Sequence, residues 1–160
     1  MYIRKKILFL FPLIFSLSVL SSDIEEIIVK GEYREKSLGE EDSSIAVIQS
    51  EQIKSQAIKH FQQLSHLVPN LNYAASDSRA RYFQIRGIGE RSGYQGTPNS
   101  SVGFLIDDID YSGQGGIATL FDVDQVEVFR GPQGSRSGAN ALAGLIYIKT
   151  KDPTEKFEGT

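Results

Sequence analysis

The 160-residue chain contains no cysteine, which excludes a disulfide scaffold, a thiolate metal site and a lipid anchor attached through cysteine. Histidine is also scarce, because His60 and His66 are the only two. Their spacing places them on different faces of a helix. We therefore expect structural roles for both histidines and no shared metal site.

Positive charge is not in excess either. Lysine and arginine number 17 against 20 aspartates and glutamates, for a formal net charge of −3. Proteins that bind nucleic acid carry a basic patch, so we expect no nucleic-acid partner. The hydrophobic fraction of 40% and the charged fraction of 23% are ordinary for a globular protein.

Residues 1–21 have the three parts of a secretory signal peptide. A basic start at positions 4–6 precedes an apolar run from Ile7 to Leu20, and small residues follow it. The alternative is a membrane anchor, but a spanning helix needs about 20 apolar residues and this run is shorter. We expect export, with cleavage after Ser21 fitting better than cleavage after Ser22.

Residues 22–43 are charged and contain few large apolar side chains apart from a short β-prone cluster ending at Val29. Such a segment lacks the apolar surface to bury itself. We expect an extended, mobile arm whose β-prone cluster can pair with the sheet edge of another protein.

Compact structure is expected over residues 44–151, in the α+β class, with two short helices, a small mixed sheet and long loops. Ser50 is expected to cap a helix that begins at Glu51. A second helix is predicted over residues 59–67, where apolar side chains recur at three- and four-residue spacing. Strands are predicted by alternation and β-propensity at four places: residues 82–86, 102–106, 125–129 and 145–150.

Two glycine- and serine-rich stretches, residues 87–101 and 110–118, separate these strands. Loops of this length in a small domain tend to be functional. Gly93 comes one residue late for the dinucleotide-binding pattern that Gly87 and Gly89 begin, and residues 131–144 lack the lysine and hydroxyl that a phosphate-binding loop requires. The acids near Asp107 lack the spacing of a calcium loop. We expect no cofactor, no metal site and no catalytic group.

The segment from Val126 to Gly134, VEVFRGPQG, closely resembles the VEVLRGPQG end of the plug domain of TonB-dependent receptors. Two further segments agree in the expected order, namely 83–89 with the F.IRG.G strand end and 102–109 with the V..YIDGV strand. Residues 25–31, EEIIVKG, resemble the TonB box. Three residues depart from the family pattern: Lys30, Asp108 and Ser137.

The resemblance implies a globular plug inside an outer-membrane barrel, with a small ligand such as a ferric siderophore or cobalamin bound on the outer side. It implies the C-terminal domain of TonB as periplasmic partner, and the receptor's own barrel as a second partner. The residues expected to bind TonB are Glu26, Ile27, Ile28, Val29 and Lys30. Arg86 and Arg130 are expected to face carboxylates of the barrel, the alternative being solvated charges at strand ends. The ligand-facing loops are expected to present Arg91, Tyr94, Gln95, Tyr111 and Gln114.

A barrel strand needs about 9–11 residues, so residues 152–160 can supply the start of a barrel and no more. We expect the chain to be a fragment of a longer receptor in the outer membrane. The alternative is a free-standing periplasmic module for binding or regulation. No nucleophile–base or metal constellation favours an enzyme.

Overall fold

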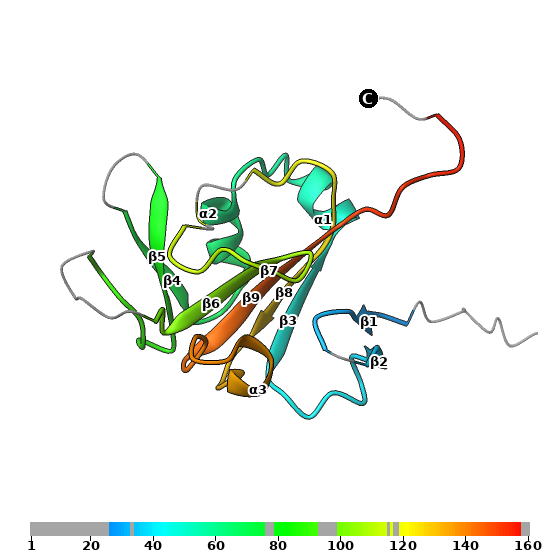
Figure 1. Cartoon of the computed structure of the whole chain (residues 1–160). Coiled ribbons are helices and arrows are strands. Elements are labelled where there is room, and N and C mark those ends of the chain that lie inside the picture. Colours follow the sequence, from blue (N-terminus) through cyan, green and yellow to red (C-terminus); the bar gives the residue numbers. More distant parts are fainter. Residues whose placement is uncertain are drawn as a thin grey trace, which may run out of the picture.

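A computed structural model describes residues 26–32, 34–75, 79–92, 99–114, 116 and 119–157 (Figure 1). The predicted signal peptide lies outside these residues. In chain order the elements are β1 (Ile28–Val29), β2 (Lys36–Ser37), β3 (Ile45–Gln49), α1 (Ser50–Ser55), α2 (Phe61–Leu64), the 3₁₀ helix η1 (Ser65–Leu67), β4 (Leu71–Ala75), β5 (Ala80–Ile85), β6 (Val102–Ile106), β7 (Ile109–Asp110), β8 (Val123–Phe129), α3 (Gly134–Ser137) and β9 (Gly144–Thr150). No helix of the described part is long and apolar enough to cross a membrane.

The centre of the fold is a five-stranded sheet in the order β3-β8-β9-β6-β7. Its pairs are antiparallel except for β6 and β9, which run parallel. Two small hairpins, β1-β2 and β4-β5, stand apart from this sheet. The prediction of an α+β fold with a small mixed sheet is therefore confirmed.

Alternation along the strands gives the sheet two apolar faces. Val126 and Val128 of β8 pack into a core with the helices and the β4-β5 hairpin. Phe129 points to the opposite face, where it packs against Val29 and Leu145 in a second, smaller cluster. Figure 1 shows α1 and α2 on one side of the sheet and the β1-β2 hairpin on the other.

Three phenylalanine rings join the helices to the central sheet and to the β4-β5 hairpin. Phe61 of α2 makes edge-on contacts with Phe83 of β5 and Phe104 of β6, with ring centroids 5.0 and 5.2 Å apart. Edge-to-face geometry at this distance adds to the stabilisation that burial alone supplies. The trio fixes α2 between the β4-β5 hairpin and the central sheet.

The predicted cap of α1 is wrong. Ser50 is the first helical residue, Gln49 occupies the N-cap position, and no side chain caps the helix. The Ser50 hydroxyl instead donates to the neighbouring Glu51 carboxylate over 2.9 Å. The helix α2 does have a side-chain cap, which the sequence analysis did not predict. The Gln63 side chain accepts hydrogen bonds from the backbone N–H groups of Lys59 and His60.

The expectation of an extended arm over residues 22–43 is also wrong for its described part. β1 and β2 pair antiparallel, with Val29 opposite Lys36, and Val29 is fully buried. The hairpin covers the second apolar face of the sheet, which local composition could not reveal. A segment too polar to form its own core is thus stabilised by a surface from β8 and β9 far along the chain.

Candidate functional site

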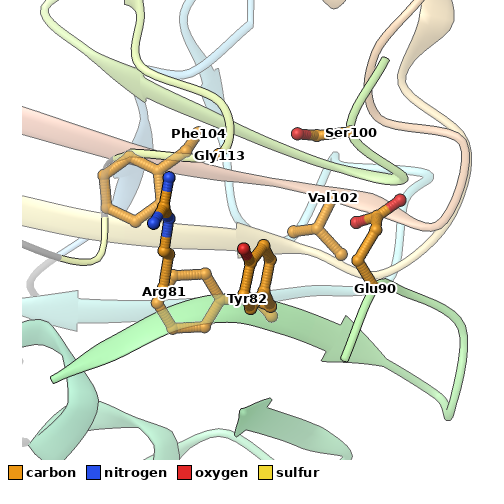
Figure 2. Close-up of a pocket in the computed structure, with 8 residues that line it drawn as sticks. Arg81, Tyr82, Glu90, Ser100, Val102, Phe104 and Gly113 are labelled. Carbon is orange, nitrogen blue, oxygen red and sulfur yellow. The ribbon is translucent and has the colours of Figure 1, made fainter. Parts of the chain in front are cut away.

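The two long loops meet at the end of the sheet where β6 and β9 begin. A Cβ atom placed on Gly113 would lie 3.5 Å from the Ser100 hydroxyl, so the loops are in contact. A small hollow between β5 and β6 is lined from both loops and both strands (Figure 2). Its lining residues are Arg81, Tyr82, Phe83, Glu90, Ser100, Val102, Phe104 and Gly113.

Glu90 organises one wall of this hollow. Its carboxylate accepts hydrogen bonds from the backbone N–H and the hydroxyl of Ser101, over 2.9 and 2.6 Å. Its backbone carbonyl accepts from the Gln84 amide of β5 over 2.6 Å. These bonds tie the start and the end of the 87–101 loop to each other and to the neighbouring strand.

The hollow is too small to enclose a drug-sized ligand by itself. Its cavity volume is about 10 Å³, against the roughly 300–1,000 Å³ of ordinary small-molecule pockets. A ligand at this end would therefore touch the loop surface and need further walls from outside the described residues.

The predicted ligand-facing residues are only partly placed by the structure. Arg91, Tyr111 and Gln114 are exposed on the two loops. Tyr94 and Gln95 lie outside the described residues. Sequence reasoning missed Arg81 and Tyr82, which line the hollow, because a strand residue beside a loop has no signature until the loops fold over it.

The predicted TonB-binding segment, residues 26–31, is held along both of its edges. On one edge β1 pairs with β2, and the Ile27 carbonyl accepts from the Leu38 N–H over 2.8 Å. On the other edge the partners are side chains of β8. The Gln125 amide donates to the Ile28 carbonyl over 2.8 Å.

Glu127 completes that second edge. Its carboxylate accepts from the backbone N–H groups of Lys30 and Gly31, over 2.6 and 2.8 Å, and from the Gln125 amide over 2.6 Å. The residue is fully buried. Burial raises the pKa of Glu127, and the hydrogen bonds from Lys30, Gly31 and Gln125 oppose that rise.

Two further contacts define the docked position. The Lys30 ammonium pairs with the Asp124 carboxylate over 2.7 Å at the partly exposed rim. At Gly31 there is no room for a side chain, since a Cβ atom there would lie 2.5 Å from a Glu127 oxygen and 2.7 Å from the Phe129 ring. A side chain at position 31 would force Glu127 or Phe129 to move.

The segment enters over the sheet from the end opposite the loops. Ile28 lies beside Gln125 and Gly31 beside Phe129, so the segment runs along β8 in the direction of β8 itself. It approaches from the end where β8 starts, whereas the loops gather at the other end, where β8 stops and β6 starts. Figure 1 shows the blue β1 and the green β4-β5 hairpin on opposite sides of the central sheet.

Both predicted barrel-facing arginines follow directly on strands. Arg86 is exposed, adopts a positive φ of 54°, and donates its backbone N–H to the Asn70 carbonyl. Arg130 donates its backbone N–H to the Ser44 carbonyl, but its side-chain Nε is buried and has no hydrogen-bond partner in the described part of the chain. A buried donor without a partner is costly, so Arg130 has unused binding capacity.

No group of three or more histidine, cysteine or acidic residues is placed to hold a metal ion within the described ranges. His60 and His66 do not come together: the His60 ring contacts Arg79, and His66 lies in η1.

Curated relatives of this chain are receptors. The pesticin receptor of Yersinia pestis is 28% identical over 72% of this chain, and the ferric enterobactin receptor PirA of Pseudomonas aeruginosa is 26% identical over 72%. In both comparisons the chain spans 17% of the relative's length.

Solved structures agree. The ferric yersiniabactin uptake receptor FyuA of Yersinia pestis superposes with a TM-score of 0.61 at 28% identity, covering 71% of this chain and 18% of that one. The ferripyoverdine receptor of Pseudomonas aeruginosa superposes with a TM-score of 0.66 at 19% identity, covering 82% and 17%, which supports the fold alone.

The family comparison covers most of the compact region. Residues 37–145 match the family described as the TonB-dependent Receptor Plug Domain, whose members are receptors and not enzymes. The match runs from β3 to the first residues of β9 and includes both long loops and β8, which holds the N-terminal segment. The chain belongs to the TonB-dependent receptor plug domain family.

Proposed function

We propose that this chain is the plug of an outer-membrane receptor that takes up a ferric siderophore and is coupled to TonB through residues 26–31. The proposal is carried by the arrangement of two predicted binding regions with respect to the two ends of one sheet. The predicted ligand loops meet at one end, and the predicted TonB-binding segment approaches from the other. Ligand and energy-coupling partner then act on opposite sides of one rigid element.

The ligand class follows from the relatives. The names of the enterobactin and yersiniabactin receptors favour a ferric siderophore over cobalamin as the cargo. The hollow of Figure 2 is too small to hold such a molecule alone, so the loops supply one part of a binding surface. The barrel of the full receptor supplies the rest.

The backbone of residues 26–31 is suited to strand addition. Affinity in this mode comes from main-chain hydrogen bonds, so the side chains at exposed positions tolerate change. Ile28 is 43% exposed even in the docked hairpin. The Arg130 guanidinium is proposed to pair with a barrel carboxylate, which would use the Nε that is unpaired among the described residues.

The test of coupling is titration calorimetry of the 160-residue chain with the C-terminal domain of TonB. Ile28→Pro removes a backbone donor and fixes φ, so we expect binding to be lost. Ile28→Ala keeps the backbone and is expected to bind within a few fold of the parent chain. Equal binding by the proline and alanine variants would show that TonB does not pair with this segment.

A further inference from the structure

The segment proposed to bind TonB forms hydrogen bonds along both of its edges, which prevents a partner strand from pairing with it. β2 covers one edge of β1, and the side chains of Gln125 and Glu127 cover the other. A strand can add to a partner sheet only through an edge whose N–H and C=O groups are free. In the docked state residues 28–31 therefore have no edge to offer.

We infer that Glu127 and Gln125 form a latch that holds residues 28–31 closed on the sheet, and that the latch must open before this segment pairs with a partner strand. The inference rests on the proposed role of the segment in TonB binding. It assigns to Glu127 a positioning role that the plug fold by itself does not require.

The Glu127 side chain makes the hydrogen bonds that a neighbouring strand would otherwise make with this segment. Its two oxygens accept the consecutive N–H groups of Lys30 and Gly31, and Gln125 donates to the Ile28 carbonyl. Backbone and amide donors compensate the burial of Glu127, and the positive charge of Arg136 also opposes the rise in its pKa. Hydrogen bonds to an ionised carboxylate are strong, and a buried carboxylate that loses them pays a desolvation cost.

The position of Glu127 on the sheet is not explained by packing. Its neighbours on the same face, Phe129 and Tyr147, are aromatic and form an apolar cluster with Val29. A carboxylate in the middle of such a face is unfavourable unless the segment above it supplies donors. The docked segment supplies two N–H groups, which accounts for the acid at this place.

Gly31 allows the latch to be opened without touching the sheet. Alanine at position 31 would clash with Glu127 and Phe129 in the docked state, but an extended strand paired elsewhere accepts it. Gly39, on the same hairpin, has open space around it, and its nearest contact would be 3.9 Å away. Gly39→Ala is therefore the matched control for Gly31→Ala.

The first readout is amide hydrogen exchange of the 160-residue chain by NMR, which needs no partner. In Gly31→Ala and Glu127→Gln we expect the amide of Lys30 to exchange at least tenfold faster, and in Gly39→Ala at the parent rate. Slow exchange retained by the amides of β8 and β9 would show that the sheet stays folded. Parent-like exchange at Lys30 in both latch variants would overturn the inference.

The second readout is the association rate with the TonB C-terminal domain. A partner that binds only the open form gains in proportion to the open fraction, so we expect at least tenfold faster association for the two latch variants. Faster exchange with unchanged association, while the parent chain binds TonB, would overturn the gating role alone. No association by any variant or by the parent would overturn the proposed function, and the gating with it.

Discussion

At the scale of single residues, Arg130 shows how the structure separates a role in folding from a role in assembly. Its backbone is part of the fold through the bond to Ser44, but its guanidinium Nε is buried with no partner in the described part of the chain. Arg136 is the opposite case. It pairs with Asp108 over 2.5 Å and lies 4.9 Å from the centre of the Tyr147 ring.

This contrast predicts different costs for two arginine truncations. Arg130→Ala removes an unpaired donor, so we expect the free energy of unfolding of the chain to change by less than about 0.5 kcal/mol. Arg136→Ala removes an ion pair and a cation–π contact, at an expected cost of about 1–2 kcal/mol. Denaturant melting of both variants is the measurement. A larger loss for Arg130→Ala than for Arg136→Ala would mean that Arg130 stabilises the plug itself.

At the scale of elements, the β6-β7 hairpin explains one departure from the family pattern. Ile106 pairs with Ile109, so Asp107 and Asp108 form a two-residue turn, and both have positive φ, 45° and 69°. This is the type I′ geometry, in which the second position favours glycine. Asp108 occupies the place of the usual glycine and adopts the glycine conformation.

Substitutions at position 108 can measure the resulting strain. Asp108→Gly and Asp108→Ala both lose the exposed ion pair with Arg136, but only alanine keeps a Cβ atom at positive φ. We expect the glycine variant to be more stable than the alanine variant by about 1 kcal/mol. Thermal melting of the pair gives the difference directly, and an alanine variant of equal stability would show that the turn relaxes to negative φ.

The sequence predicted those elements whose pattern is local. β6 and β8 appear where alternation and β-propensity placed them, with β8 beginning at Val123 and not at Gln125. β3 and β4 were not predicted as strands: Ile45–Gln49 is short and leads straight into α1, and Leu71–Ala75 follows a turn without alternation. Their strand conformation comes from pairing with β8 and β5.

The candidate sites divide in the same way. The resemblance to the receptor family implied roles for the two loops and the 26–31 segment, because each of its motifs lies within a few neighbouring residues. The latch could not be predicted, since Glu127 and Lys30 are 97 residues apart and meet only when β1 lies over β8. Arg81 and Tyr82 were missed for the same reason, because the loops that turn them into a wall come later in the chain.

At the scale of the whole molecule, the sheet separates two cores of unequal size. The larger joins α1, α2 and the β4-β5 hairpin to one face and includes the trio around Phe61. The smaller lies under the β1-β2 hairpin and includes Val29. The hairpin has two strands of two residues each, so it adds little structure of its own and depends on the sheet.

This asymmetry predicts that the hairpin opens while the larger core stays closed. Phe61→Leu weakens the larger core by about 1–2 kcal/mol, so amides of β8 and β9 that exchange through global unfolding should exchange about tenfold faster. The amides of Lys30 and Gly31 should keep their parent rates, because local opening of the hairpin leaves the surroundings of Phe61 intact. Val29→Ala should accelerate both groups, since it destabilises the docked state from which every opening starts. Hydrogen exchange by NMR distinguishes the cases residue by residue. If Phe61→Leu accelerated Lys30 and Gly31 as much as β8, the hairpin would open only when the whole plug unfolds, and partner binding at residues 26–31 would require global unfolding of this chain.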